Sequence, residues 1–294
     1  MKKNILLVAS LLFAGSAIAQ TTTMTSKNGH EILPQAGDYA LGMDAIPFAN
    51  FFLNSVNIMN NTGQQAQHPG YVGGFNQVIV GKYFLDESTA VRARLGINSL
   101  STTTTTFFDS PIDVANGVAN PGELSDANKM SNSNIVIGGG LEMRRGHNRL
   151  QGFYGGELLI ARGGSKVKNE YGQEYSQAAE DAGFMGLGDS RLLNSKSGSF
   201  GLGLRGFAGV EYFFAPKISI GAEFGWGLGM MRSGRGKSTI ETWDIVGSAS
   251  SGSVTTEEIE GPSKMGMFGF GVDNGSVGGA IFGGSAALML TFHF

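Results

Sequence analysis

The feature of this sequence that most constrains its fold is a long alternation of apolar residues with small or polar ones. From Ile218 to Met230 every second residue is apolar, and the residues between them are Ser219, Glu223 or glycine. The segments 200–212 and 91–97 show the same alternation. Successive side chains of a β-strand point to opposite faces, so a period of two predicts strands with one apolar face.

Composition excludes several other classes of protein. The 294 residues include 47 glycines but only 7 prolines and no G-X-Y period, which excludes collagen. The absence of cysteine excludes a disulfide scaffold, and a formal net charge of −3 without a basic block makes nucleic acid an unsuitable partner. No apolar run of about 18 residues follows the N-terminus, so a helical membrane protein is excluded. What remains is an all-β protein rich in glycine and phenylalanine.

The N-terminus reads as an export signal. Lys2 and Lys3 precede the apolar segment 5–14, and Ala17 and Ala19 supply the small residues that a signal peptidase recognises. We therefore predict a signal peptide at 1–19, a short periplasmic tail at 20–35, and one domain at 36–294.

Connections of alternating length predict how the strands are arranged. Three connections are tight and four are long, and the two kinds alternate along the chain; the long ones are 47–72, 101–132, 163–198 and 232–275. The predicted strands lie near 38–46, 73–84, 89–100, 133–145, 150–162, 199–213, 217–231 and 276–294. Short periplasmic turns and long extracellular loops are typical of outer-membrane barrels, whereas a β-sandwich has no reason to sort its loops by length. We predict a closed antiparallel transmembrane β-barrel of eight strands, or ten if the last loop contains another hairpin.

The polar face of these strands predicts what fills the barrel. If the apolar face contacts lipid, the opposite face carries five acidic and five basic residues: Asp44, Lys82, Arg92, Arg94, Glu142, Arg144, Glu157, Arg205, Glu211 and Glu223. Buried charges need partners, and eight strands leave a lumen barely wide enough for side chains. We expect a charge-balanced network that plugs the lumen.

Aromatic residues mark the expected membrane boundaries. Tyr83, Tyr212 and Phe214 precede tight turns and Trp226 lies farther along its strand, as expected of an aromatic girdle. The chain stops at Phe294, with Phe292 on the same face. Here the sequence resembles the small outer-membrane barrels of the OmpA/OmpW type, without a peptidoglycan-binding domain. This resemblance implies that the terminal aromatics are read by the barrel-assembly machinery.

Residues suited to catalysis or metal binding are scarce. Of the four histidines, His30 lies in the tail, His147 in a tight turn and His293 on the inward face near the turns, which leaves only His68 in a long outward loop. No two histidines share a ligand-like spacing. We predict no catalytic residues, no metal and no cofactor.

The loops are the remaining interaction surface. The leading hypothesis is a non-enzymatic barrel of the Gram-negative outer membrane that acts as a structural or interaction platform through its long loops. Its partners would be outer-membrane lipid, the assembly machinery, and an envelope protein or an extracellular partner. The alternative is a narrow, porin-like channel or a lateral route for small hydrophobic molecules, and a lipid-modifying enzyme based on His68 is the third.

Overall fold

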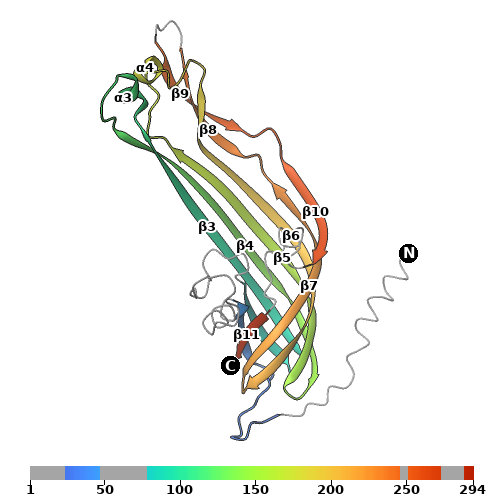
Figure 1. Cartoon of the computed structure of the whole chain (residues 1–294). Helices are drawn as coiled ribbons and strands as arrows, with labels where there is room; N and C mark the ends of the chain where they lie inside the picture. The colour runs from blue at the N-terminus through green and yellow to red at the C-terminus, as the bar shows by residue number, and fades with distance from the viewer. Residues whose placement is uncertain (1–23, 47–77, 246–250, 273–287) are drawn as a thin grey trace, which may run out of the picture.

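The chain forms a single large antiparallel sheet. The computed structural model describes residues 24–46, 78–245, 251–272 and 288–294. The strands are β1 (Tyr39–Asp44), β2 (Val78–Asp86), β3 (Thr89–Asp109), β4 (Glu123–His147), β5 (Leu150–Glu170), β6 (Ser190–Ala215), β7 (Ile218–Ser233), β8 (Lys237–Asp244), β9 (Ser253–Glu260), β10 (Met265–Val272) and β11 (Leu288–His293). Among the described residues, two short helices, α3 (Pro111–Ala115) and α4 (Gln177–Asp181), lie near the top of Figure 1.

Eight of these strands close into a ring. Neighbouring strands from β1 to β7 pair in chain order, and β11 pairs with both β7 and β1. The ring is therefore antiparallel throughout, and the predicted all-β fold is confirmed. Strand β7 has two partners on its second edge, because β10 pairs with residues 226–233 and β11 with residues 218–222.

The predicted tight turns join the strands at one end of the ring, which we call the turn end. β2–β3, β4–β5 and β6–β7 are each joined by two residues, and Asn148 and Lys217 have positive φ angles of 62° and 59°. Asparagine adopts this conformation readily, whereas lysine does so rarely. Contacts to its backbone on both sides hold Lys217 in place: its N–H donates to the Ile32 carbonyl (3.2 Å), and its carbonyl accepts from His293 N–H (2.8 Å).

The strands extend much farther than predicted at the opposite end. Most of 101–132 and 163–198, expected as long loops, continues β3, β4, β5 and β6, and only 110–122 and 171–189 connect them. The missing signal is apolar alternation, because these extensions have no buried face and are rich in Thr, Ser and Asn. Polar side chains contact each other across the strands there in place of apolar ones, as Ser101 Oγ and Ser131 Oγ do at 3.0 Å.

The predicted loop 232–275 also contains strands. β8 and β9 form the hairpin that Thr239–Ile245 and Val254–Ile259 suggest, and β8 pairs with β6. β10 was not predicted, although Met265, Met267, Phe268 and Phe270 alternate largely with glycine. The predicted loop 47–72 and the segments 73–77 and 276–287 of two predicted strands lie outside the described residues.

Inward and outward side chains alternate around the ring. Phe84 and Phe213 are buried while their neighbours Tyr83 and Tyr212 are exposed. Glycines make room for some of the inward rings: a Cβ on Gly155 would lie 2.6 Å from the Phe207 ring. None of the described helices is long and apolar enough to span a membrane.

Candidate functional site

The ten charged residues predicted on the inward face all lie inside the ring. Each is at most 7% exposed. Arg92 of β3 is the centre of the network, because its Nη1 lies 2.6 Å from Glu223 Oε2 and 3.2 Å from Glu142 Oε2. Its Nε lies 3.6 Å from Glu157 Oε2. One guanidinium thus joins carboxylates from β4, β5 and β7 across the interior.

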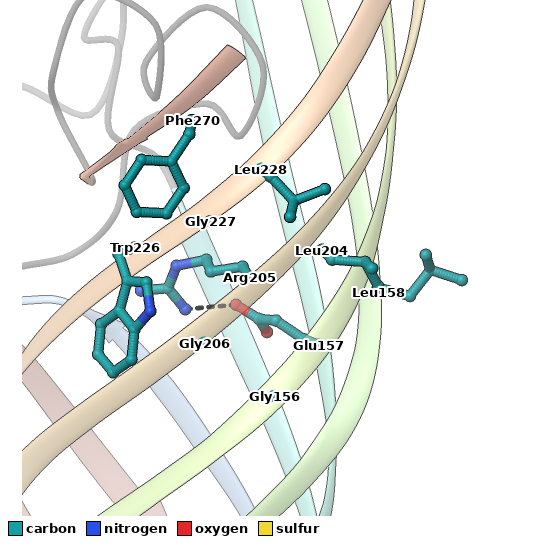
Figure 2. A pocket seen from close by; sticks show the side chains of 10 residues that line it. All are labelled: Gly156, Glu157, Leu158, Leu204, Arg205, Gly206, Trp226, Gly227, Leu228 and Phe270. Atoms are coloured by element: carbon teal, nitrogen blue, oxygen red, sulfur yellow. Dashed lines mark hydrogen bonds and ion pairs between the residues drawn. The ribbon is translucent and has the colours of Figure 1, made fainter. Parts of the chain in front are cut away.

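Two further arginines surround the same carboxylates. Arg205 of β6 pairs with Glu157 and lies 2.7 Å from Glu223, and Arg94 lies 3.3 Å from Glu157. Figure 2 shows the Arg205–Glu157 contact between neighbouring strands. With Arg92, these residues form a compact group of three guanidinium cations around two shared carboxylates.

A second group lies nearer the turn end. Lys82 pairs with Glu142 (2.8 Å), and Arg144 pairs with Glu211. Arg144 also lies 4.0 Å from Glu142, so this carboxylate links the two groups. Asp44 lies at the end of β1, where its carboxylate accepts a hydrogen bond from Ile46 N–H (2.9 Å).

Four inward phenylalanine side chains also belong to the network, although the sequence analysis did not predict them. The Arg92 guanidinium lies 4.2 Å from the centre of the Phe207 ring, and Lys82 Nζ lies 4.9 Å from that of Phe153. Arg144 lies over both Phe84 and Phe213. These phenylalanines share the strand parity of the inward charges, so the alternation that located Arg205 and Glu211 could also have located Phe207 and Phe213.

Ser219, His293 and Glu211 meet in the lower part of the interior, and their geometry does not fit a catalytic triad. His293 Nε2 faces both Ser219 Oγ (3.3 Å) and Glu211 Oε1 (3.4 Å). A triad needs the acid at Nδ1, which here has no hydrogen-bond partner. The Ser219 hydroxyl instead donates to Glu211 at 2.5 Å. His68 lies outside the described residues.

The predicted aromatic residues lie on the outer face. Tyr83, Tyr212, Phe214, Trp226, Phe292 and Phe294 are all exposed. The Tyr83 ring lies 5.0 Å from that of Tyr39, near the turn end. Trp226, however, does not end the outward apolar face, which continues along β7 through Leu228 and Met230 to Arg232.

An outer depression of about 500 Å³ lies beside Trp226. Its apolar lining comes from Leu158, Leu204, Trp226, Leu228 and Phe270, on β5, β6, β7 and β10 (Figure 2). Gly206 forms part of its floor, and a Cβ there would lie 3.4 Å from the indole. Packing of Trp226 against a glycine therefore shapes this part of the outer face.

The far end of the long strands forms a compact unit that we call the head: residues 105–127, 171–192, 240–245 and 251–257. Trp243 is buried there against Ala179 and Met185, with Tyr175 beside them. Its indole N–H donates to Glu180 Oε2 (3.0 Å). The Trp243 contacts thus fasten α4 to β8, so the connection between β5 and β6 is ordered by its own small core.

Arg191 provides a second fixed point in the head. Its guanidinium lies 4.0 Å from the centre of the Tyr175 ring and 4.5 Å from that of Tyr171. It donates to Glu241 Oε2 and to the Gln173 carbonyl, both at 2.6 Å. Burial raises the pKa of the Tyr175 phenol above its ordinary value. Sequence reasoning missed this cluster, because its residues come from a predicted loop.

The head is strongly acidic. Arg191 is the single basic residue in the ranges given above, against eleven acidic ones: Asp109, Asp113, Glu123, Asp126, Glu174, Glu180, Asp181, Asp189, Glu241, Asp244 and Glu257. Because Arg191 is paired with Glu241, almost all of this negative charge is uncompensated. The head therefore presents an anionic surface.

Replacing Trp243 with alanine should loosen the head without opening the ring. Loss of the buried indole costs about 3–5 kcal/mol at the site, and the Glu180 contact is lost with it. We expect limited proteolysis to cut 171–189 faster, with the thermal unfolding of the ring unchanged. Ile245→Ala is the matched control, since Ile245 is exposed at the end of the same hairpin arm. Equal protease resistance of both variants would show that Trp243 does not hold the head together.

Two negative results complete the description of the site. Among the described residues, no three His, Cys, Asp or Glu side chains lie close enough to hold a metal ion. Comparison of the sequence with models of known protein families and with curated proteins found no match.

Proposed function

We propose that this protein is a non-enzymatic β-barrel of the bacterial outer membrane that carries its head outward as an interaction platform. The observation that carries the proposal is the inverted distribution of side chains. Leu204, Phe224 and Phe270 are 56%, 55% and 68% exposed on the outer face, while charged side chains fill the interior. An outer face of this kind is unsuited to water and suited to lipid.

The dimensions of the outer apolar face support this proposal. The outward residues of β6 from Tyr212 to Phe200 are all apolar or glycine and are separated by twelve residue steps. At about 3.3 Å per residue and about 40° of tilt they cover roughly 30 Å, near the ~25 Å apolar band of outer-membrane barrels. The predicted signal peptide at 1–19 supports export, and the outward aromatic residues Phe292 and Phe294 fit the OmpA/OmpW type of barrel and its assembly machinery.

The interior network supports a plug instead of an open pore. Side chains of β2 to β7 meet across the ring through ion pairs and ring contacts. We therefore expect no steady conductance when the purified protein is inserted into planar bilayers. Steady open conductance would contradict the plug, and a mature chain that stays soluble without detergent would contradict the membrane location.

The platform role rests on the head. The Trp243 core and the Arg191 contacts hold an acidic surface at the far end of the long strands β3 to β6. An envelope protein or an extracellular partner can reach this surface. Partners of this surface should carry positive charge, and binding should weaken as salt rises. Pull-down from native envelopes with the wild type and the Trp243→Ala variant tests whether recovery of a partner depends on an intact head.

A lateral route for small hydrophobic molecules is the second candidate. Within the described ranges, β3 pairs with β2 only up to Gly96, and its residues from Ile97 onward pair only with β4. β10, likewise, pairs only with β7. Among the described residues, these two strand edges have no pairing partner above the network. Uptake of a hydrophobic dye into proteoliposomes, with no ion conductance, would favour this route over the platform.

A further inference from the structure

A patch of basic side chains lies on the outer face between the apolar band and the head. Seven residues of β4 to β8 make up this patch, which we call the basic collar: Lys129, Arg162, Lys166, Lys168, Lys196, Arg232 and Lys237. All except the half-exposed Lys237 are exposed. They share the strand parity of outward residues such as Leu158, Leu204 and Leu228, so they project from the same face as the apolar band.

The register places like charges directly beside one another. Lys196 of β6 is paired with Lys166 of β5 on one side and with Lys237 of β8 on the other. Lys129 of β4 is paired with Lys168 of β5. Like charges opposite each other destabilise a sheet, so this arrangement lowers stability unless an anion compensates it.

Carboxylates of the chain compensate only part of the collar. Lys168 lies 2.5 Å from Glu170, and Lys237 lies 2.7 Å from Glu258. In the part of the chain that the structure describes, Arg162, Lys166, Lys196, Arg232 and Lys129 form no ion pair. Lys129 and Lys196 are attracted electrostatically by Glu170 and Glu258, whereas no described carboxylate lies at ion-pair distance from Arg162, Lys166 or Arg232.

The lowest members of the collar lie at the edge of the apolar band. Arg162 and Arg232 flank Phe200 in one cross-strand row. Arg162 comes two residues after the exposed Ile160, and Arg232 two residues after the exposed Met230. In the proposed barrel this row lies at the headgroup level of the outer leaflet, and the lysines lie just above it. At this depth, arginine guanidinium groups can donate two hydrogen bonds to one phosphate, and lysine ammonium groups can pair with phosphate oxygens.

We propose that the basic collar binds the phosphate groups of phosphorylated glycolipids in the outer leaflet. The proposal rests on the membrane location proposed above. Arg162 and Arg232 hold phosphates at the edge of the apolar band, while Lys166 and Lys196 bind anionic groups farther from the acyl chains. The acyl chains of the same lipid pack on Ile160, Leu202 and Met230, so one ligand covers both the apolar and the basic surface.

The test compares two triple variants with equal loss of charge. Arg162→Gln/Lys196→Gln/Arg232→Gln removes three of the seven collar charges, and Lys27→Gln/Arg145→Gln/Lys264→Gln removes three exposed charges outside the collar. Bisphosphorylated lipid A is added to each protein in an uncharged detergent, and bound lipid is counted by native mass spectrometry. Removal of one cation near an anionic lipid surface weakens binding by about fivefold, so the collar variant should bind at least about tenfold more weakly than the control variant.

Further binding and competition measurements identify the ligand. Dephosphorylated lipid A should not bind, and millimolar inorganic phosphate should not compete, because it lacks the acyl chains. Equal lipid A binding by both variants would overturn the proposal. Preferential binding of polyglutamate over lipid A would also overturn it, and would assign the collar to an acidic protein such as the head of a second copy.

A readout of membrane insertion separates this proposal from the membrane location. Both variants should insert into bilayers as the wild type does, with Trp226 quenched by brominated acyl chains. If Trp226 is quenched in the collar variant and this variant still binds lipid A as the control does, the collar proposal is wrong and the membrane location stands. Absence of quenching in the wild type would remove the membrane location and the collar proposal together.

Discussion

Replacing Arg92 with methionine should destabilise the protein by about 3–5 kcal/mol, because three buried carboxylates lose a shared cation. Glu142, Glu157 and Glu223 all lie within 3.6 Å of the Arg92 guanidinium. The side chain of methionine fills much of the same volume, so the loss comes mainly from uncompensated charge. Urea unfolding of the detergent-solubilised protein, followed by tryptophan fluorescence, measures the change.

Two further variants show whether the effect of Arg92 is electrostatic. Arg145→Met removes an exposed arginine next to a tight turn and should change stability by no more than about 0.5 kcal/mol. Adding Glu223→Gln to the Arg92 variant removes one of the stranded charges and should restore part of the lost stability. If Glu223→Gln further weakens the Arg92 variant, the network is not held by charge balance.

Replacing Leu228 with arginine should cost about 2 kcal/mol when the protein is folded in lipid. Leu228 is exposed on the outer face, four residues before Arg232 and beyond Trp226. An arginine on the lipid face costs about 2–4 kcal/mol at the midplane of the bilayer and about 0–1 near its surface. Leu228 lies between these levels, nearer the middle of the apolar band. Unfolding in bilayer vesicles measures the cost.

Phe200→Arg is the matched control for depth. Phe200 is also exposed (51%, against 43% for Leu228) but lies between Arg162 and Arg232, at the edge of the apolar band. Its replacement should cost about 1 kcal/mol or less. Equal costs for both substitutions, or a larger cost for Phe200→Arg, would mean that the apolar band does not follow the depth of a bilayer.

Strand parity could be predicted from the sequence because it is a local property. Arg92, Arg94 and Lys82 alternate with apolar residues, and one buried face is enough to assign them inward. The same reasoning reaches β5, where Gln151, Phe153 and Glu157 are inward and Leu158 and Ile160 are outward. The partners of each charge, by contrast, depend on the register between strands that are far apart in sequence.

The extensions and the head could not be predicted in this way. Above the apolar band neither face of β3 or β4 is buried, so no hydrophobic pattern distinguishes strand from loop. The five consecutive threonines at 102–106 favour a strand through residue type alone. The Trp243 core joins residues more than sixty positions apart, and Arg191 stacks on two tyrosines from a loop, which no local pattern specifies.

Brominated lipids provide the most direct test of which surface touches the membrane. The chain has two tryptophans: Trp226 is exposed within the outer apolar band, and Trp243 is buried in the head. Trp243→Phe leaves Trp226 as the only tryptophan, and Trp226→Phe leaves Trp243. In vesicles of brominated phosphatidylcholine, Trp226 fluorescence should be strongly quenched and Trp243 fluorescence should not change. Unquenched Trp226, or equal quenching of both residues, would contradict a lipid-facing ring with a head that stands in water.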